Sequence, residues 1–238
     1  SRRRHTRLLT VTGVQTCALP ICPRIALVHA LPDSVEPANT AFKQEWPEAW
    51  VFNVLDDALA RDQAAAGDDQ RAAMVINSRI IDLGRYAYAS GAKGILYTCS
   101  AFGRSIITAG KLIPCPVLRP NEAAVDAALD AGPRIALLAT FEPTVGMMKA
   151  EVEAAAKQRN LNPTVDSRLV PGALKALQSG DGATHDRLIA EAAASLPEVD
   201  AVVLAQFSMT RAASSIKGRN VITTPGSAIA RLRKLLGA

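Results

Sequence analysis

Short apolar runs alternate along this chain with longer amphipathic segments. In the first half, the runs that predict strands are residues 24–30, 49–55, 93–98 and 115–118. In the second half, they are residues 133–140, 163–170, 201–205 and 220–223. Runs that stay apolar at consecutive positions indicate strands buried on both faces, as in a parallel sheet. The intervening segments, such as 68–90 and 144–159, favour helices, so we predict an open α/β fold with right-handed crossovers.

The two halves of the chain resemble each other. PRIAL at 23–27 recurs at 133–137, and ILYTCSAFG and CPVLRPNEA have counterparts in VVLAQFSMT and NVITTPGSA. Counted from the isoleucine of each PRIAL, Cys99 lies 74 residues on and Gln206 lies 71 residues on. This order predicts an internal duplication, with two similar Rossmann-like lobes related by a pseudo-twofold axis. Because open α/β sheets bind ligands at the carboxyl ends of their strands, we expect the site in the cleft between the lobes.

The first 22 residues do not fit this pattern. Residues 11–21, VTGVQTCALPI, resemble the in-frame translation of a common sequencing-library adapter. A secretion signal is the alternative, but polar residues interrupt its apolar stretch. We therefore expect 1–22 to be a non-native, disordered tail, 23–122 to form lobe 1 and 123–224 to form lobe 2.

Removing the tail changes the picture given by composition. Four of the 27 basic residues and none of the 22 acidic residues lie in the tail, so the remainder is nearly neutral. Nothing then points to nucleic acid or an anionic membrane as partner. Two of the four cysteines also lie in the tail, which leaves too few for a disulfide framework and fits the cytoplasm. No apolar run is long enough to span a membrane.

The most informative chemistry lies in YTCSAFG, residues 97–103. Cys99 ends an apolar run where a helix is expected to begin, and a helix N-terminus can lower the pKa of a thiol. The N–H groups of Ser100 and Ala101 would then be placed to hold a carboxylate or an enolate-like oxygen. The alternative is that Cys99 is only a small apolar residue capping a strand.

Other polar residues lie near predicted strand ends. His29 can orient a carboxylate or a base, or simply hydrogen-bond within its loop. Thr140, which the repeat places opposite His29, has a hydroxyl suited to an anion, and Phe141 follows it. Asn121 lies at a strand-to-helix turn, where a helix cap is the simpler interpretation.

Several residues are expected to be structural. Asp33 and Ser34 are candidates to cap a helix, as is Asp181. We expect Cys115, between two prolines, to be a buried thiol. We expect His185 to lie on the surface. Phosphate loops and metal-ligand motifs are missing from the sequence, so we expect no cofactor and no metal.

Taken together, PRIALVHA, ILYTCSAFG, PVLRPNEA, RIALLATFEPT, VPGALKAL, GDGATHDRL and VVLAQFSM resemble the aspartate/glutamate racemase superfamily. The resemblance implies two α/β lobes, with the final helix, here 225–238, packing back on lobe 1. It also implies catalysis without pyridoxal phosphate or metal, by one cysteine from each lobe. Cys99 matches the first-lobe cysteine, but Gln206 stands where the second-lobe cysteine should be. An amide cannot donate and accept a proton as a thiol does.

The leading hypothesis is a cofactor-independent, racemase-like enzyme that acts on the α-carbon of a small carboxylate or amino acid through Cys99, and that can form a homo-oligomer. A one-thiol decarboxylase or cis–trans isomerase of the same superfamily is the first alternative, and a non-catalytic small-acid binder is the second. If racemisation were fast, His185 or Ser208 would be the first candidates for the missing base. The expected substrate-binding residues are His29, Ser100, Ala101, Asn121, Thr140, Phe141, Phe207 and Ser208.

Overall fold

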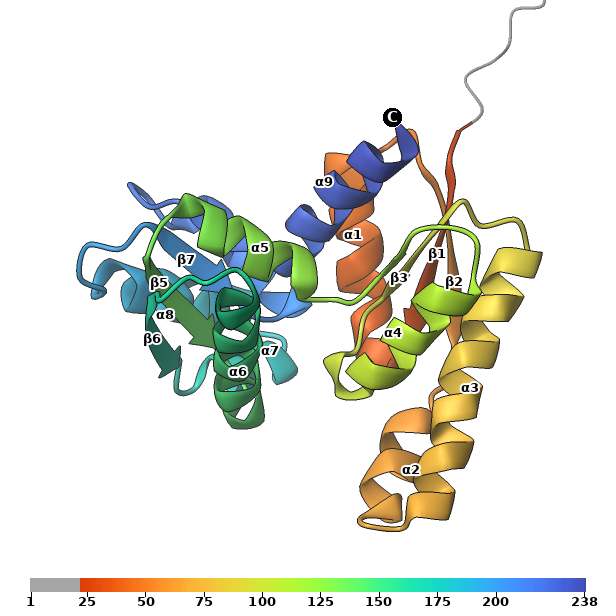
Figure 1. The fold of residues 1–238 in the computed structure, drawn as a ribbon. Coiled ribbons are helices and arrows are strands. Elements are labelled where there is room, and N and C mark those ends of the chain that lie inside the picture. Colours follow the sequence, from red (N-terminus) through yellow and green to blue (C-terminus); the bar gives the residue numbers. More distant parts are fainter. Residues whose placement is uncertain (1–21) are drawn as a thin grey trace, which may run out of the picture.

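The structure is a computed structural model that describes residues 22–238, so the expectations for the tail lie almost entirely outside the described residues. It contains two four-stranded sheets in which every strand pair is parallel (Figure 1). The strand order is β2-β1-β3-β4 in one sheet and β6-β5-β7-β8 in the other. The strands are β1 (Arg24–His29), β2 (Trp50–Leu55), β3 (Gly94–Tyr97), β4 (Val117–Leu118), β5 (Arg134–Ala139), β6 (Thr164–Leu169), β7 (Ala201–Leu204) and β8 (Val221–Thr223). The predicted α/β fold is confirmed.

Helices connect successive strands and cover the sheets. The α-helices are α1 (Val35–Glu45), α2 (Leu59–Ala66), α3 (Gln70–Ala89), α4 (Gly103–Leu112), α5 (Glu122–Ala131), α6 (Glu142–Gln158), α7 (Ala173–Gln178), α8 (Gly182–Ala194) and α9 (Thr224–Leu236). Three 3₁₀ helices, η1 (Pro32–Ser34), η2 (Ser100–Phe102) and η3 (Phe207–Ser215), follow β1, β3 and β7. No helix of the described part of the chain is both long and apolar enough to cross a membrane.

The strand registers reveal the duplication in three dimensions. The two PRIAL copies run into β1 and β5, and each of these strands pairs with the second and third strand of its own sheet. Ile25 pairs with Gly94, and Ile135 pairs with Ala201. One detail of the sequence-based alignment is wrong: β1 ends at His29 and β5 ends at Ala139, so Thr140 corresponds to the residue after His29.

The last helix belongs to the core of the first lobe, although it follows the second lobe in sequence. Ala228, Ile229 and Leu232 of α9 are buried in one cluster with Ile25 and Leu27 of β1. Figure 1 shows α9 lying beside α1, and the two helices are in contact. The chain therefore leaves lobe 1 after β4 and returns to it through α9. Apolar side chains at helical spacing cause this return, because they would otherwise face water.

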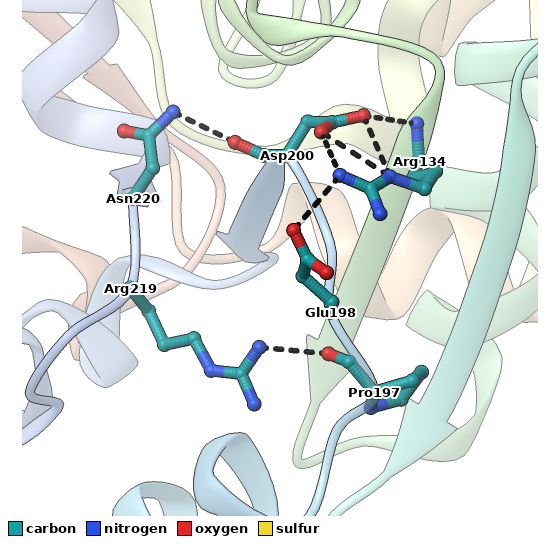
Figure 2. A network of polar contacts seen from close by, with 6 residues as sticks. All are labelled: Arg134, Pro197, Glu198, Asp200, Arg219 and Asn220. Carbon is teal, nitrogen blue, oxygen red and sulfur yellow. Dashed lines mark hydrogen bonds and ion pairs between the residues drawn. The ribbon is translucent and has the colours of Figure 1, made fainter.

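A polar network holds together the amino-terminal ends of β5, β7 and β8 (Figure 2). Arg134 donates from its backbone N to Asp200 Oδ2 at 2.8 Å and from its guanidinium to Asp200 Oδ1 at 2.7 Å. Asn220 Nδ2 donates to the Asp200 carbonyl at 3.0 Å, and Arg219 reaches the Pro197 carbonyl at 2.7 Å. These contacts lie at the sheet edge opposite the carboxyl ends, so they stabilise the scaffold and leave the other edge to function.

Candidate active site

Cys99 and Gln206 occupy equivalent positions in the two lobes. Each lies two residues beyond the end of its strand, β3 or β7, and each is the residue that precedes a 3₁₀ helix. Both have extended backbones, with φ and ψ of −121° and 121° at Cys99 and −138° and 146° at Gln206. Both are half-buried. The structure thus places the thiol and the amide at matching carboxyl ends, where parallel sheets bind ligands.

The segments that follow these two residues reach the opposite lobe. The Ser100 hydroxyl lies 3.3 Å from the sulfur of Met147, on α6 of the second lobe. Phe207, at the start of η3, packs in the first-lobe cluster that contains Leu27 and Leu96. The carboxyl ends of β3 and β7 therefore lie along the contact between the lobes.

His29 ends β1 and is the centre of a hydrogen-bond network next to Cys99. Its Nδ1 lies 2.8 Å from the Ser34 hydroxyl and 2.9 Å from the hydroxyl of Thr98, the residue before Cys99. Its Nε2 lies 2.9 Å from Asn53 Oδ1, and Asn53 Nδ2 donates to Asn39 Oδ1. Because Oδ1 only accepts, Nε2 carries the proton and Nδ1 accepts from a hydroxyl. The network ties the ends of β1, β2 and β3 together.

This network assigns His29 a positioning role. The side chain is only 1% exposed, and both ring nitrogens already have protein partners. Burial lowers its pKa, against the smaller opposing effect of the Asn53 hydrogen bond, so the ring is neutral near neutral pH. Of the alternatives for His29, a group that orients its neighbours fits this geometry better than a group that contacts the substrate.

The electrostatics at Cys99 differ from the expectation. Burial raises the pKa of the Cys99 thiol, and the N–H of Ala101 opposes this effect only in part. The helix that begins here opens with a single 3₁₀ turn, and desolvation of the thiolate outweighs the N-terminal N–H groups. Burial also raises the pKa of Cys115, and Lys93 opposes this effect. Cys115 is half-buried against the first-lobe core, less buried than expected.

Thr140 and Gln206 are joined directly. The backbone N of Thr140 donates to Gln206 Oε1 at 2.6 Å, and the Thr140 hydroxyl donates to the same oxygen at 3.0 Å. Thr140 is 5% exposed. Both of its donors therefore hold Gln206, whereas the sequence suggested that they would face an anion.

The remaining candidates are placed as follows. Phe141, next to Thr140, is half-exposed at the start of α6; Ala101 is exposed and Ser208 is half-buried. Asn121 precedes α5, but its side chain makes no capping bond, and its Nδ2 lies 3.5 Å from Glu151 Oε1. Asn121 is thus buried, and its amide faces α6 instead of capping α5.

The residues expected to be structural differ in their outcome. Ser34 and Asp33 make no capping bond to α1, because the Ser34 hydroxyl bonds to the Leu31 carbonyl and His29 instead. Asp181 does cap α8, through Thr184 N at 3.0 Å. The surface position expected for His185 is wrong: it is completely buried, and its Nδ1 bonds to the Ala173 carbonyl at 2.9 Å.

Two surface cavities of about 280–290 Å³ lie away from Cys99 and Gln206. One lies between α1 and β2 beside Phe42 and Trp46, and the other lies where α5, α6 and α9 meet. Neither is lined by Cys99 or Gln206. Within residues 22–238, no group of three or more His, Cys, Asp or Glu side chains could hold a metal ion.

Three further residues near the site were not expected from the sequence: Thr98 and Asn53, which bond to His29, and Met147, which contacts Ser100. The sequence does contain one indication of Asn53, because it is a polar residue inside the otherwise apolar strand WVFNVL. Thr98 directly precedes Cys99, but its link to His29 depends on strand pairing. Met147 comes from the other lobe, and no local pattern indicates that contact.

Comparison with known proteins adds independent information. A model of the Asp/Glu/Hydantoin racemase family matches residues 35–231. The sequence matches none of the curated proteins with which it was compared. Among solved structures, an aspartate racemase homologue from Pyrococcus horikoshii OT3 is 11% identical, with a TM-score of 0.66 over 90% of this chain and 99% of that one.

Two further solved structures show the same fold. Allantoin racemase from Klebsiella pneumoniae is 16% identical, with a TM-score of 0.65 over 91% of this chain and 88% of that one. Unliganded arylmalonate decarboxylase is 15% identical, with a TM-score of 0.62 over 91% and 94%. At these low identities the comparisons show a shared fold only. The reaction in the name of each solved structure is a property of that protein.

Proposed function

Because the chain belongs to the Asp/Glu/Hydantoin racemase family, we propose that it is a cofactor-independent enzyme that transfers a proton at the α-carbon of a small carboxylate through the Cys99 thiol. The single observation that supports this most strongly is the equivalence of Cys99 and Gln206 at the two strand ends. Only one of these two groups can carry a proton near neutral pH. The proposed chemistry is therefore racemase-like but works from one face of the carbon.

The neighbours of Cys99 support this role. His29 and Thr98 hold the end of β3, and the thiol follows directly. The N–H groups that begin η2 would receive a carboxylate or an enediolate oxygen of the substrate, because the donors at a helix start are otherwise unsatisfied. Phe141, half-exposed at the start of α6, would supply an apolar wall.

A second candidate function is decarboxylation followed by protonation. Its support is the raised pKa of Cys99, which keeps the thiol protonated in the free protein. A protonated thiol is ready to deliver its proton to an enediolate, whereas racemisation must begin by removing a proton. In that reaction a substituted malonate would lose carbon dioxide, and the enediolate left behind would take the Cys99 proton on one face.

The test is proton exchange in deuterated water over a panel of amino acids, hydroxy acids and substituted malonates. We expect Cys99→Ala to abolish α-proton exchange or decarboxylation, and Cys115→Ala, the matched control, to retain it. Exchange with retention of configuration would support one-face chemistry, and carbon dioxide release would select the decarboxylase. Fast inversion of configuration by the unaltered protein would require a second base and would contradict one-face chemistry. Carboxylate binding without any turnover would indicate that the protein is a non-catalytic binder.

A further inference from the structure

We propose that α3 is a dimerisation helix, along which two copies of this chain pack antiparallel to each other about a twofold axis. The axis crosses the helix between Ile76 and Asn77. The proposal assigns a surface to the homo-oligomer considered from the sequence, and it does not depend on the chemistry proposed for Cys99.

Exposed apolar side chains gather on two adjacent helices of the first lobe. Within residues 22–238, α3 and α4 hold half of the large apolar residues that are exposed. These are Met74, Val75, Tyr86 and Tyr88 on α3 and Ile107 and Leu112 on α4. The two helices contact each other, and Figure 1 shows α3 at the outer margin of the lobe. Single apolar residues on a surface are ordinary, but a concentration on neighbouring helices indicates an interaction surface.

The outward side of α3 carries a continuous line of exposed residues. Four residues of the helix are buried and share its inward face: Ile76, Ile80, Gly84 and Ala87. At about 3.6 residues per turn, a second line of positions, spaced three and four residues apart, runs along the opposite face. Every position of this line is exposed: Asp68, just before the helix, and Arg71, Val75, Ser78, Asp82 and Arg85.

The charges along this line are self-complementary. The order from Asp68 is acidic, basic, apolar, polar, acidic, basic, and reading the line backwards reverses the sign of every charge. Two antiparallel copies therefore place Arg71 opposite the partner's Asp82, and Asp68 opposite the partner's Arg85. The twofold axis makes each pair occur twice. Parallel copies would instead set each charge against its own like charge. This pattern selects a second copy of the chain as the occupant.

Apolar contact supplies the affinity of this dimer, and the charges fix its register. Val75 and Met74 lie beside the axis and are 57% and 64% exposed. The exposed large apolar side chains of α3 and α4 offer on the order of 500 Å² per copy, toward the roughly 800 Å² that each partner of a stable interface buries. Exposed ion pairs each contribute little, but like charges brought together oppose a wrong pairing. Asp82 already accepts from Arg85 of its own helix at 3.1 Å, so the partner's Arg71 adds a second cation.

The first test is a charge swap, read as the dimer dissociation constant from sedimentation equilibrium of the full chain. Arg71→Asp should raise this constant about tenfold or more, because a like charge then faces the partner's Asp82 twice per dimer. Asp82→Arg should do the same. The two changes combined exchange the signs and should restore the constant to within about threefold. Lys149→Asp, the same reversal on the exposed side of α6, is the matched control and should change nothing.

The second test concerns the centre of the interface. Val75→Asp places a carboxylate beside the axis and should leave only monomer at concentrations where the unaltered protein is dimeric. Because Val75 is exposed in the single chain, the far-ultraviolet circular dichroism spectrum should stay unchanged. Leu235→Asp, at a residue 55% exposed on α9, is the matched control and should retain the dimer.

The outcomes decide for or against the proposal. An unaltered protein that stays monomeric throughout the micromolar range overturns it, and so does a dimer that resists both Arg71→Asp and Val75→Asp. Loss of the dimer in each single reversal without recovery in the combined variant refutes the antiparallel register. Recovery in the combined variant supports the proposal, because a different partner protein would not change sign with this chain. If Val75→Asp fails to fold, the charge swap alone decides.

Discussion

A buried thiol holds its proton more tightly than an exposed one, and this property limits what Cys99 can do. Its pKa is raised from the ordinary value of 9.0 by desolvation. At pH 7 the thiol form therefore predominates over the thiolate. In the free protein Cys99 is consequently an acid, and it can act as a base only when a bound substrate or a closed site changes its surroundings.

The first prediction concerns this protonation state. Iodoacetamide should label Cys99 slowly at pH 7, and the rate should keep rising with pH beyond pH 9, because only the thiolate reacts. Peptide mass mapping separates Cys99 from Cys115. A rate that levels off below pH 8 would show that the site stabilises a thiolate, which would contradict the desolvation argument. Protection of Cys99 by a bound carboxylate would place it at the ligand site.

A second prediction concerns His29. Burial lowers its pKa below 6.5, so the unfolded chain binds the proton more strongly than the folded protein. The stability contributed by the neutral ring is therefore complete above pH 6.5 and is lost as pH falls through the lower, folded value. His29→Leu removes the bonds that Ser34, Thr98 and Asn53 make to the ring and should cost about 2–4 kcal/mol at pH 7. Urea unfolding from pH 5 to pH 8 measures both effects.

The matched control for His29 is Ser34→Ala, which removes one partner and leaves the ring in place. It should cost about 1 kcal/mol and retain the pH dependence of the unaltered protein. The difference between His29→Leu and the unaltered protein should shrink toward low pH. A constant difference would mean that folding does not shift the pKa of the ring.

At the scale of elements, α3 packs unusually close to β3 because Gly84 has no side chain. A Cβ at Gly84 would overlap the Tyr97 hydroxyl and lie 2.8 Å from Ile113 Cδ1. Tyr97 is buried, and its hydroxyl donates to the Ile80 carbonyl of α3 at 2.8 Å. The glycine therefore allows a buried tyrosine to bond to the backbone of the helix that covers it.

We predict that Gly84→Ala destabilises the protein by about 1–3 kcal/mol, although alanine favours helices, because the overlap must be relieved in a packed core. Gly146→Ala is the matched control: it lies on the exposed side of α6 with no atom within 4 Å of the new Cβ. That change should stabilise the protein by up to about 1 kcal/mol. Thermal unfolding measures both, and Gly84→Ala combined with Tyr97→Phe should recover part of the loss. Equal effects of the two alanines would refute close packing at Gly84.

The strands were predictable from sequence because each is a short apolar run. The central strands β1, β3, β5 and β7 are buried on both faces, whereas the edge strands β2 and β6 are only partly buried, contrary to expectation. All eight predicted strands are present, with ends that differ by at most two residues. The side-chain partners were less predictable, because they depend on tertiary contacts. Ser34 and Asn121 have the residue types of helix caps, yet their side chains bond elsewhere. His185 has a polar side chain in a polar segment, but the helix face that carries it turns inward.

The site was predictable only in part, for the same reason. The repeat indicated Cys99 and Gln206 because each follows its copy of the repeated strand at a similar sequence separation. The bond between Thr140 and Gln206 depends on the pairing of β5 with β7, which the sequence does not specify side chain by side chain. The raised pKa of Cys99 depends on burial by residues distant in sequence.

At the scale of the whole molecule, the two lobes share one hydrophobic cluster. Leu232 and Ile229 of α9 and Phe207 of η3 are buried with Ile25 and Leu27 of the first sheet. An ion pair between Arg231 of α9 and Asp126 of α5 also joins the returning helix to the second lobe. Since Phe207 of the second lobe lies in this cluster, the first lobe loses part of its core when the second is unfolded.

The last prediction follows from this shared core. Leu232 is completely buried, so Leu232→Ala should lower the free energy of unfolding by about 2–4 kcal/mol, through lost apolar contact and a cavity. At about 2–4 °C per kcal/mol for a chain of this size, the melting temperature should fall by several degrees. Leu235→Ala, on the same helix but 55% exposed, should change stability by less than about 0.5 kcal/mol. Calorimetry should show a single transition in both variants, with equal calorimetric and van't Hoff enthalpies, because damage to the shared cluster destabilises both lobes. Two separate transitions, of which only one moves in Leu232→Ala, would show instead that the lobes fold independently and that α9 serves the first lobe alone.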